Sequence, residues 1–254
     1  MKIYAIAINT FKEAIRDKIF YSLVFFAALI IGASILLSML SVGESEKIIA
    51  DISLASINFF GVIISIFVGI GLVYKELEKK TIYTIISKPI RRSDFLLGKY
   101  LGLALTLLVY VSVMSATFML VIYLYSGSLP YKLLPAVLLI YFELLIVTAA
   151  ATLFSTFSTP SLSASYTLAI YVIGHLTGDL KGLAAKTKVV SGKVLLESAY
   201  YILPNLENFN IKGKVVHDLP VPVAYFGQVM AYGLLYVAGL LIIAVMVFQK
   251  RNFK

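Results

Sequence analysis

The chain has 254 residues, of which 60% are hydrophobic and only 14% are charged, and its net charge is +9. A soluble domain carries about a quarter charged residues, so this chain cannot cover a globule with polar side chains. We expect an integral membrane protein. The absence of cysteine excludes disulfides, thiolate nucleophiles and sulfur-ligated metal sites. The cations gather beside apolar segments, which is typical of membrane-flanking loops rather than of a nucleic-acid-binding surface.

Residues 2–18 predict an amino-terminal amphipathic helix. Ile8, Phe11 and Ile15 recur at helical spacing, and charged residues occupy the other side. Such a helix can lie in the membrane interface, although periodicity alone equally allows a simple continuation of the first span. The segment lacks the short apolar core and small-residue cleavage site of a signal peptide, so we expect it to be retained.

Six apolar segments follow, each long enough to cross a hydrocarbon core about 30 Å thick. We therefore predict an all-α integral membrane protein forming a single domain over residues 1–254. The turn signals Ser126-Gly127-Ser128 and Pro130 separate the third span from the fourth. Two GxxxG pairs, Gly98–Gly102 and Gly174–Gly178, allow close helix contacts. The six spans are expected at about 19–40, 52–74, 100–125, 133–154, 161–180 and 223–248.

The distribution of Lys and Arg predicts the orientation. If the amino terminus is cytoplasmic, the segments 1–18, 75–99 and 250–254 are inside and hold fourteen of the 22 basic residues. The two short outside loops hold one each, and the long connection before the last span holds six. Long loops constrain orientation less than short ones. We expect both termini in the cytoplasm.

Residues 181–222 form an extracellular region in this topology. The stretch Val194–Leu203 is apolar enough to pack on the outer leaflet or dip into it before Pro204 ends it. One interpretation is an outer gate over a pathway, with Leu195, Tyr200 and Tyr201 as its candidate residues. The other is a folded extracellular loop without a gating role.

No catalytic or metal-binding pattern is present in the sequence. His175 and His217 have no partner at metal-ligand spacing, and no GxxxxGK[ST] phosphate loop occurs. We expect no enzyme activity, no metal site and no directly bound cofactor. Any ATP-driven work must then come from another polypeptide.

Glu143 is the acidic residue nearest the middle of a predicted span. An ionised group there costs about 3 kcal/mol even on lenient insertion scales, so it must face the bundle interior, water or a hydrogen-bonding neighbour. It could contact a substrate or a proton, or it could be a polar contact that fixes helix packing. The candidate substrate-path residues are Asn58, Glu143, Tyr166, His175 and Gln228.

The segment between the second and third spans, residues 75–99, contains seven basic and three acidic residues. Glu76–Ile86 suits a short helix, Pro89 forces a turn, and Ser93 is placed to cap the next helix with Asp94 in its first turn. A helix of this kind at the membrane surface can transmit the motion of a docked partner. An interfacial hairpin held by anionic lipid is the alternative.

The same segment resembles the cytoplasmic coupling loop of type-2 ATP-binding-cassette (ABC) transporter permeases. The similarity lies in Glu78, Thr81, the Ser87-Lys88-Pro89-Ile90 turn, and the closing Phe95 and Gly98-Lys99, with Lys80 where many members have glycine. The opening NTFKEAIRDKIFY resembles the connecting helix of the family. YYILPNLENFNIK, residues 200–212, is similar to a subgroup that includes the permease for maturation of multicopper enzymes such as nitrous-oxide reductase.

The resemblance implies a membrane-spanning permease subunit of an ATP-driven transporter, with export as the expected direction. It implies that two ABC ATPase subunits, which carry ATP and Mg²⁺, bind the permease. It also implies a second copy of this permease or a homologous one, with the pathway at the dimer interface. The expected location is the inner membrane of a prokaryotic cell, and no nucleic acid is expected as a partner. The residues it assigns to ATPase coupling are Glu76, Glu78, Lys79, Thr81, Ile85, Ser87, Pro89, Arg92, Phe95 and Lys99.

Two other classes of function remain open from the residues themselves. An ion-gradient-driven secondary transporter or channel would use Glu143 in a proton relay and need no ATPase. A non-transporting membrane anchor would hold a soluble complex through residues 75–99.

Overall fold

The computed structural model describes residues 2–39, 44–78, 91–187 and 190–250. The side chains of residues 72–73, 75–78, 190 and 195 also lie outside what it describes. The described chain is helical throughout, which confirms the expected all-α fold. Its elements are α1 (Lys2–Ile15), α2 (Lys18–Ser38), α3 (Ser45–Glu78), α5 (Arg92–Ser126), η1 (Tyr131–Leu133), α6 (Leu134–Ser155), α7 (Pro160–His175), α8 (Thr177–Lys186), α9 (Val190–Ile202), η2 (Leu206–Phe209), α10 (Lys212–Val216) and α11 (Val223–Lys250).

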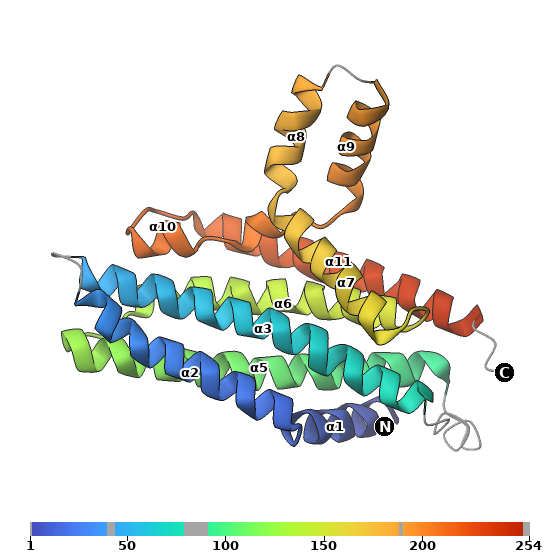
Figure 1. Cartoon of the computed structure of the whole chain (residues 1–254), viewed down its shortest axis with the longest axis horizontal. Coiled ribbons are helices and arrows are strands. Elements are labelled where there is room, and N and C mark those ends of the chain that lie inside the picture. The colour runs from blue at the N-terminus through green and yellow to red at the C-terminus, as the bar shows by residue number, and fades with distance from the viewer. Residues whose placement is uncertain (1, 40–43, 79–90, 188–189, 251–254) are drawn as a thin grey trace.

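The long helices α2, α3, α5, α6 and α11 run side by side along the long axis of the molecule (Figure 1). Within the described chain, five helical segments are long and apolar enough to cross a membrane. They confirm five of the six expected spans. The most apolar windows of α3 and α6 are 72% buried, whereas those of α2 and α11 are 22% buried, so α3 and α6 form the centre of the bundle.

The outer helices expose large apolar side chains, among them Phe25 at 62%, Leu124 at 73% and Leu235 at 75%. In water these side chains would promote aggregation, because large exposed apolar patches favour association. On a bundle of membrane-spanning length they are the surface expected to face lipid.

The fifth predicted span, 161–180, is not one helix. α7 covers 16 residues and ends at His175, and α8 begins at Thr177 after a break at Leu176. At about 1.5 Å per residue, α7 is about 24 Å long. At the break, Thr177 Oγ1 donates to the carbonyl of Gly174 at 2.5 Å, and a Cβ on Gly174 would lie 2.9 Å from the carbonyl oxygen of Pro204. Gly178 has open space around it, so only Gly174 of this GxxxG pair makes a close contact.

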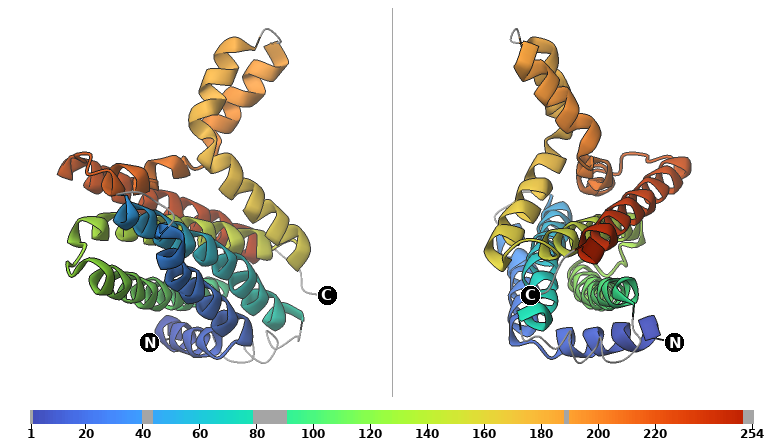
Figure 2. Two further views of the ribbon diagram at one scale, coloured as in Figure 1. Left: turned by 60° about the vertical axis from the view of Figure 1, so that its left-hand side comes forward. Right: turned by 90° about the vertical axis from the view of Figure 1, so that its right-hand side faces the viewer.

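α8 and α9 form a helical hairpin that stands away from the bundle (Figures 1 and 2). Residues 181–186 belong to α8, and α9 ends at Ile202, two residues before Pro204. The chain then returns through η2 and α10 to α11. η2 packs into the core through the fully buried Leu206 and Phe209.

α1 lies across the end of the bundle where α5 begins (Figure 2). A Cβ on Gly98 would meet Ile6 Cβ at 2.7 Å, and one on Gly102 would meet Thr10 Cβ at 2.5 Å, so this GxxxG pair makes the close contact that it predicts. The buried face of α1 consists of the small residues Ala7, Thr10 and Ala14. The expected stripe of Ile8, Phe11 and Ile15 is only partly buried.

Other helix boundaries differ from the expected ones at their ends. α1 stops at Ile15, and Asp17 caps α2 by accepting a 2.9 Å bond from the Ile19 amide. α3 begins at Ser45 rather than near 52. Ser93 does not cap the third span: Arg91 is the N-cap residue, without a side-chain bond, and Asp94 lies in the first turn as expected. Gly127, in the left-handed conformation with φ 72°, ends α5 at the predicted turn.

Candidate functional site

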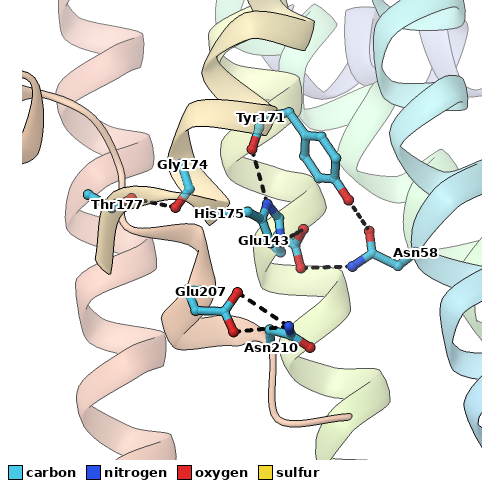
Figure 3. Close-up of polar contacts among 8 residues, drawn as sticks. All are labelled: Asn58, Glu143, Tyr171, Gly174, His175, Thr177, Glu207 and Asn210. Atoms are coloured by element: carbon cyan, nitrogen blue, oxygen red, sulfur yellow. Dashed lines mark hydrogen bonds and ion pairs between the residues drawn. The ribbon is translucent and has the colours of Figure 1, made fainter. Parts of the chain in front are cut away.

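The buried carboxylate of Glu143 is at the centre of a polar cluster inside the bundle (Figure 3). Asn58 of α3 donates through Nδ2 to Glu143 Oε2 at 3.0 Å. His175 of α7 places Nε2 3.4 Å from Glu143 Oε1. The side chain of Glu143 is 0% exposed and that of Asn58 is 1% exposed. The sequence prediction that Glu143 must face neighbours inside the bundle is confirmed.

Tyr171 completes the cluster. Its hydroxyl donates to Asn58 Oδ1 at 3.3 Å, and its carbonyl oxygen lies 3.0 Å from His175 Nδ1. The tyrosine and histidine rings are 4.6 Å apart between centroids. Because the Tyr171 hydroxyl donates to the oxygen of the Asn58 amide, the nitrogen of that amide is left to donate to Glu143. The four residues therefore join α3, α6 and α7 through one continuous network.

Three of the five candidate path residues, Asn58, Glu143 and His175, thus come together. The other two do not. Tyr166 is 43% exposed and packs its ring against Phe154 at 5.4 Å. Gln228 lies on the exposed side of α11. Tyr171 is also in the network, and its spacing of four residues before His175 places both on one face of α7.

The cluster lies where α7 ends and the α8–α9 hairpin begins. His175 is the last residue of α7, and Gly174 beside it contacts Leu206 and Pro204 of the returning chain. Below the cluster in Figure 3, Asn210 donates to both carboxylate oxygens of Glu207 at 3.1 and 3.3 Å. Polar contacts therefore concentrate at the base of the hairpin.

The candidate gate residues have different surroundings. Tyr201 is 81% exposed on α9, and the Tyr200 ring lies under the Lys181 ammonium at 5.6 Å, joining α9 to α8. The Leu195 side chain lies outside the described residues. At the base of the hairpin, the Tyr236 hydroxyl donates to the Ile202 carbonyl and the Tyr232 hydroxyl accepts a 2.9 Å bond from the Asn205 amide.

A second candidate site is the end of the bundle that carries α1, the start of α5 and the end of α11. Arg92 donates through Nη1 to the carbonyl oxygens of Phe248 and Gln249 at 3.3 and 3.0 Å. Phe95 stacks on Phe248 at 6.1 Å. These contacts join the first turn of α5 to the last turn of α11.

Lys99 is buried at this end, 1% exposed, with its ammonium 3.6 Å from the Glu13 carboxylate of α1. Phe95 is also buried, at 4%. In this structure neither side chain is on the surface for direct contact with a docked protein, and both hold neighbouring helices instead. The other coupling candidates lie outside the described residues: Lys79, Thr81, Ile85, Ser87 and Pro89 entirely, and Glu76 and Glu78 beyond their helical backbone.

The described part of the chain contains no candidate metal site. No group of three or more His, Cys, Asp or Glu residues there is arranged to hold a metal ion.

A sequence model of the ABC-2 family transporter proteins matches residues 4–253. The chain belongs to this family. A search of curated proteins finds no match. The family consists of membrane components of ABC transporters that act with an ABC ATPase and are generally not catalytic themselves. The ABC-2 assignment and the five long apolar helices together make the chain a multi-pass membrane protein.

Proposed function

We propose that this ABC-2 protein is the permease subunit of an ATP-driven exporter that works with two separate ATPase subunits. Residues 75–99 would receive the ATPase, as the resemblance of this segment implies. ATP and Mg²⁺ would be bound by the partner. Two copies of the permease, or one copy with a homologue, would form the pathway between them, in a prokaryotic inner membrane with both termini cytoplasmic.

The observation that carries this proposal is the way the bundle is joined on either side of that segment. Glu78 ends α3, and α5 begins at Arg92, at the end of the bundle where α1 crosses and α11 finishes (Figure 1). Arg92 is bonded to α11, and Lys99 and the Gly98–Gly102 contact hold α1. A force applied just before α5 would move three helices together, because packed helices shift as rigid bodies.

The α8–α9 hairpin has a separate role in this proposal. We infer that the α8–α9 hairpin gates the outer side, with Leu195, Tyr200 and Tyr201 on its second helix. The hairpin packs mainly on itself and meets the bundle at its base, as a movable element should. The similarity of residues 200–212 supports membership of the subgroup that serves maturation of multicopper enzymes.

Co-purification tests the main proposal. The chain should be expressed together with its genomic neighbours and isolated in lipid nanodiscs. We expect a complex with two ATPase subunits whose hydrolysis rate changes on reconstitution with the permease. Failure of any nucleotide-binding protein to co-purify would contradict the proposal and favour a gradient-driven transporter or an anchor.

A pair of variants localises the contact. Glu78→Ala should reduce co-purification of the ATPase, because the resemblance places Glu78 at the coupling helix. Lys193→Ala, on the projecting hairpin, changes a charge far from that end and should leave binding unchanged. Equal binding by both variants would exclude Glu78 from docking.

A further inference from the structure

The base of the α8–α9 hairpin is attached to the bundle at two places. On the incoming side, His175 and Gly174 end α7 beside Glu143 and Leu206. On the outgoing side, Ile202 and Asn205 are bonded to tyrosines of α11. The tyrosine bonds do not depend on pH near neutrality, because both use hydroxyl groups and backbone atoms. The His175 contact is different, because it joins an imidazole to a carboxyl group and a proton can sit on either one.

The proton positions in the cluster follow from its acceptors. The carbonyl oxygen of Tyr171 can only accept, so its 3.0 Å contact with His175 Nδ1 is a hydrogen bond in the tautomer that carries a hydrogen on Nδ1. A neutral histidine protonated at Nδ1 presents a lone pair at Nε2. That lone pair would face Glu143 Oε1 at 3.4 Å. Two acceptors at this distance repel, so the contact is favourable only with a proton between them.

The proton can reside on either partner. Placed on Nε2, it makes an imidazolium paired with a carboxylate; placed on Oε1, it makes a carboxylic acid beside a neutral imidazole. Either arrangement keeps the pair neutral as a whole, which suits a buried position better than a single charge. Oε2 is already engaged by Asn58, and Oε1 has no hydrogen bond from another described residue.

The other groups facing Glu143 do not supply this proton. Asn58 of α3 does not titrate, and the Tyr171 hydroxyl of α7 is directed to Asn58. Tyr110 of α5 donates to the Ile57 carbonyl at 3.0 Å, and Tyr232 of α11 binds the Asn205 amide. On the η2 and α10 side, Glu207 and Lys212 act on Glu143 with opposite charges.

We propose that Glu143 and His175 form a one-proton site that fastens the base of the α8–α9 hairpin to the bundle. With the shared proton present, α7 is held against α6 up to its last residue and the hairpin keeps the position in Figure 1. When the proton leaves, the neutral imidazole has one hydrogen for two acceptors, the Tyr171 carbonyl and Glu143 Oε1, so one of the two contacts is lost. The pair then also holds a buried negative charge, and the hairpin base is released. This inference deepens the gate proposed above and rests on it for its role in transport, but not for its chemistry.

The direction of the pH effect follows. Raising the pH removes the shared proton and releases the hairpin, whereas lowering it keeps at least one hydrogen between the two groups. A transition linked to one proton changes the ratio of released to fastened molecules by up to tenfold per pH unit.

The full-length chain in nanodiscs allows a direct test, because it has no native cysteine. Spin labels at Leu183→Cys on α8 and Leu124→Cys on α5, both exposed positions, would report the hairpin-to-bundle distance by pulsed electron paramagnetic resonance. We expect one narrow distance at low pH and a second, broader one that grows as the pH rises. A distribution independent of pH would overturn the proposal.

Glu143→Gln is the decisive variant. The glutamine oxygen can still accept from Asn58, and its amide hydrogen can donate to Nε2 of a neutral His175 without a shared proton. The narrow distance should therefore persist as the pH rises, and the growth of the broad distance should disappear. Glu197→Gln makes the same chemical change on the exposed surface of α9 and should titrate like the wild type. A wild-type titration in E143Q, or its loss in E197Q, would each refute the proton site.

The same labels separate this inference from the proposed function. If pH moves the hairpin through Glu143 but the nucleotide state of a bound ATPase does not, the proton site stands and the gating role in an ABC exporter fails. If the nucleotide state moves it and pH does not, the proton site fails and the exporter proposal stands.

Discussion

Asn58 and Glu143 are separated by 85 residues in the sequence and are joined by a 3.0 Å hydrogen bond in the fully buried interior. The bond links α3 to α6, the two most buried long helices. A carboxylate inside the bilayer is tolerated only with such partners. The pair therefore contributes to stability only while both members are present.

We predict a strongly non-additive double-mutant cycle for this pair. Asn58→Leu alone should lower the free energy of unfolding by about 1–3 kcal/mol, because it leaves a buried acceptor unpaired. In a Glu143→Leu background the same change should cost less, by about 0.6–1.7 kcal/mol. Equilibrium unfolding in mixed micelles measures all four proteins, and strict additivity would show that the bond contributes nothing.

The GxxxG contact predicts a local effect of a single methyl group. Gly102→Ala would place a Cβ 2.6 Å from the backbone oxygen of Ala7, which cannot move without shifting α1. We expect a loss of about 1–3 kcal/mol from overpacking and faster hydrogen exchange in residues 2–15. Gly32→Ala, with open space around it, is the matched control. Unchanged exchange in the Gly102 variant would mean that α1 is not held by this contact.

Two neighbouring arginines should behave differently at the start of α5. Arg92→Ala removes two bonds to carbonyls of the last turn of α11, and charged hydrogen bonds contribute about 1.5–3 kcal/mol. Hydrogen exchange over residues 246–250 should therefore rise. Arg91 is exposed and makes no side-chain capping bond, so Arg91→Ala should leave it unchanged. Similar exchange in the two variants would argue against the Arg92 contact.

The opposite end of the bundle carries the exposed ion pair Lys132–Asp218, with 2.8 Å between Nζ and Oδ1. Its hydrogen bond and charge lower the pKa of Asp218 below 3.8 and raise the pKa of Lys132 above 10.5. The depressed Asp218 pKa means that its stabilisation is lost as the pH falls through that pKa. The raised Lys132 pKa means that the stabilisation is lost as the pH rises through it.

Between those limits the pair is fully charged, yet both side chains are exposed and solvent screens them. We expect Asp218→Asn to change the melting temperature only slightly near neutral pH, and the difference to vanish in high salt. A large, salt-independent change would show that the pair is shielded by something that covers this end, such as a second subunit.

The sequence predicted those features that depend on local composition. Five spans followed from apolar length, the end of α5 from Gly127, and the end of α9 from Pro204, because a span, a left-handed cap and a helix stop are each decided within a few residues. A close helix contact at Gly98 and Gly102 was predicted, although the helix that makes it, α1, was not. The face of α1 that packs was not predicted either, because small residues can approach Gly98 and Gly102 more closely than the larger Ile8 and Phe11 can.

The candidate site was predicted only in part for the same reason. Glu143 required a partner, but which of the polar residues on other spans would meet it depended on how α3, α6 and α7 dock. The break at Leu176 was missed because no proline marks it. It coincides with the tertiary approach of Pro204 and Leu206 to Gly174 and with the local bond from the Thr177 hydroxyl to the Gly174 carbonyl. The burial of Phe95 and Lys99 was not predicted, because it depends on α1 and α11, which are distant in the sequence.

The shortness of α7 has a consequence for the surrounding bilayer. A helix of about 24 Å ends several ångströms short of a hydrocarbon layer about 30 Å thick, and Asp179 and Lys181 follow within six residues of its end. Lipid tails cannot solvate these charges. On the α7 side the membrane must therefore thin, admit water, or give way to another protein surface, so this is the side of the molecule at which polar matter can enter the bilayer.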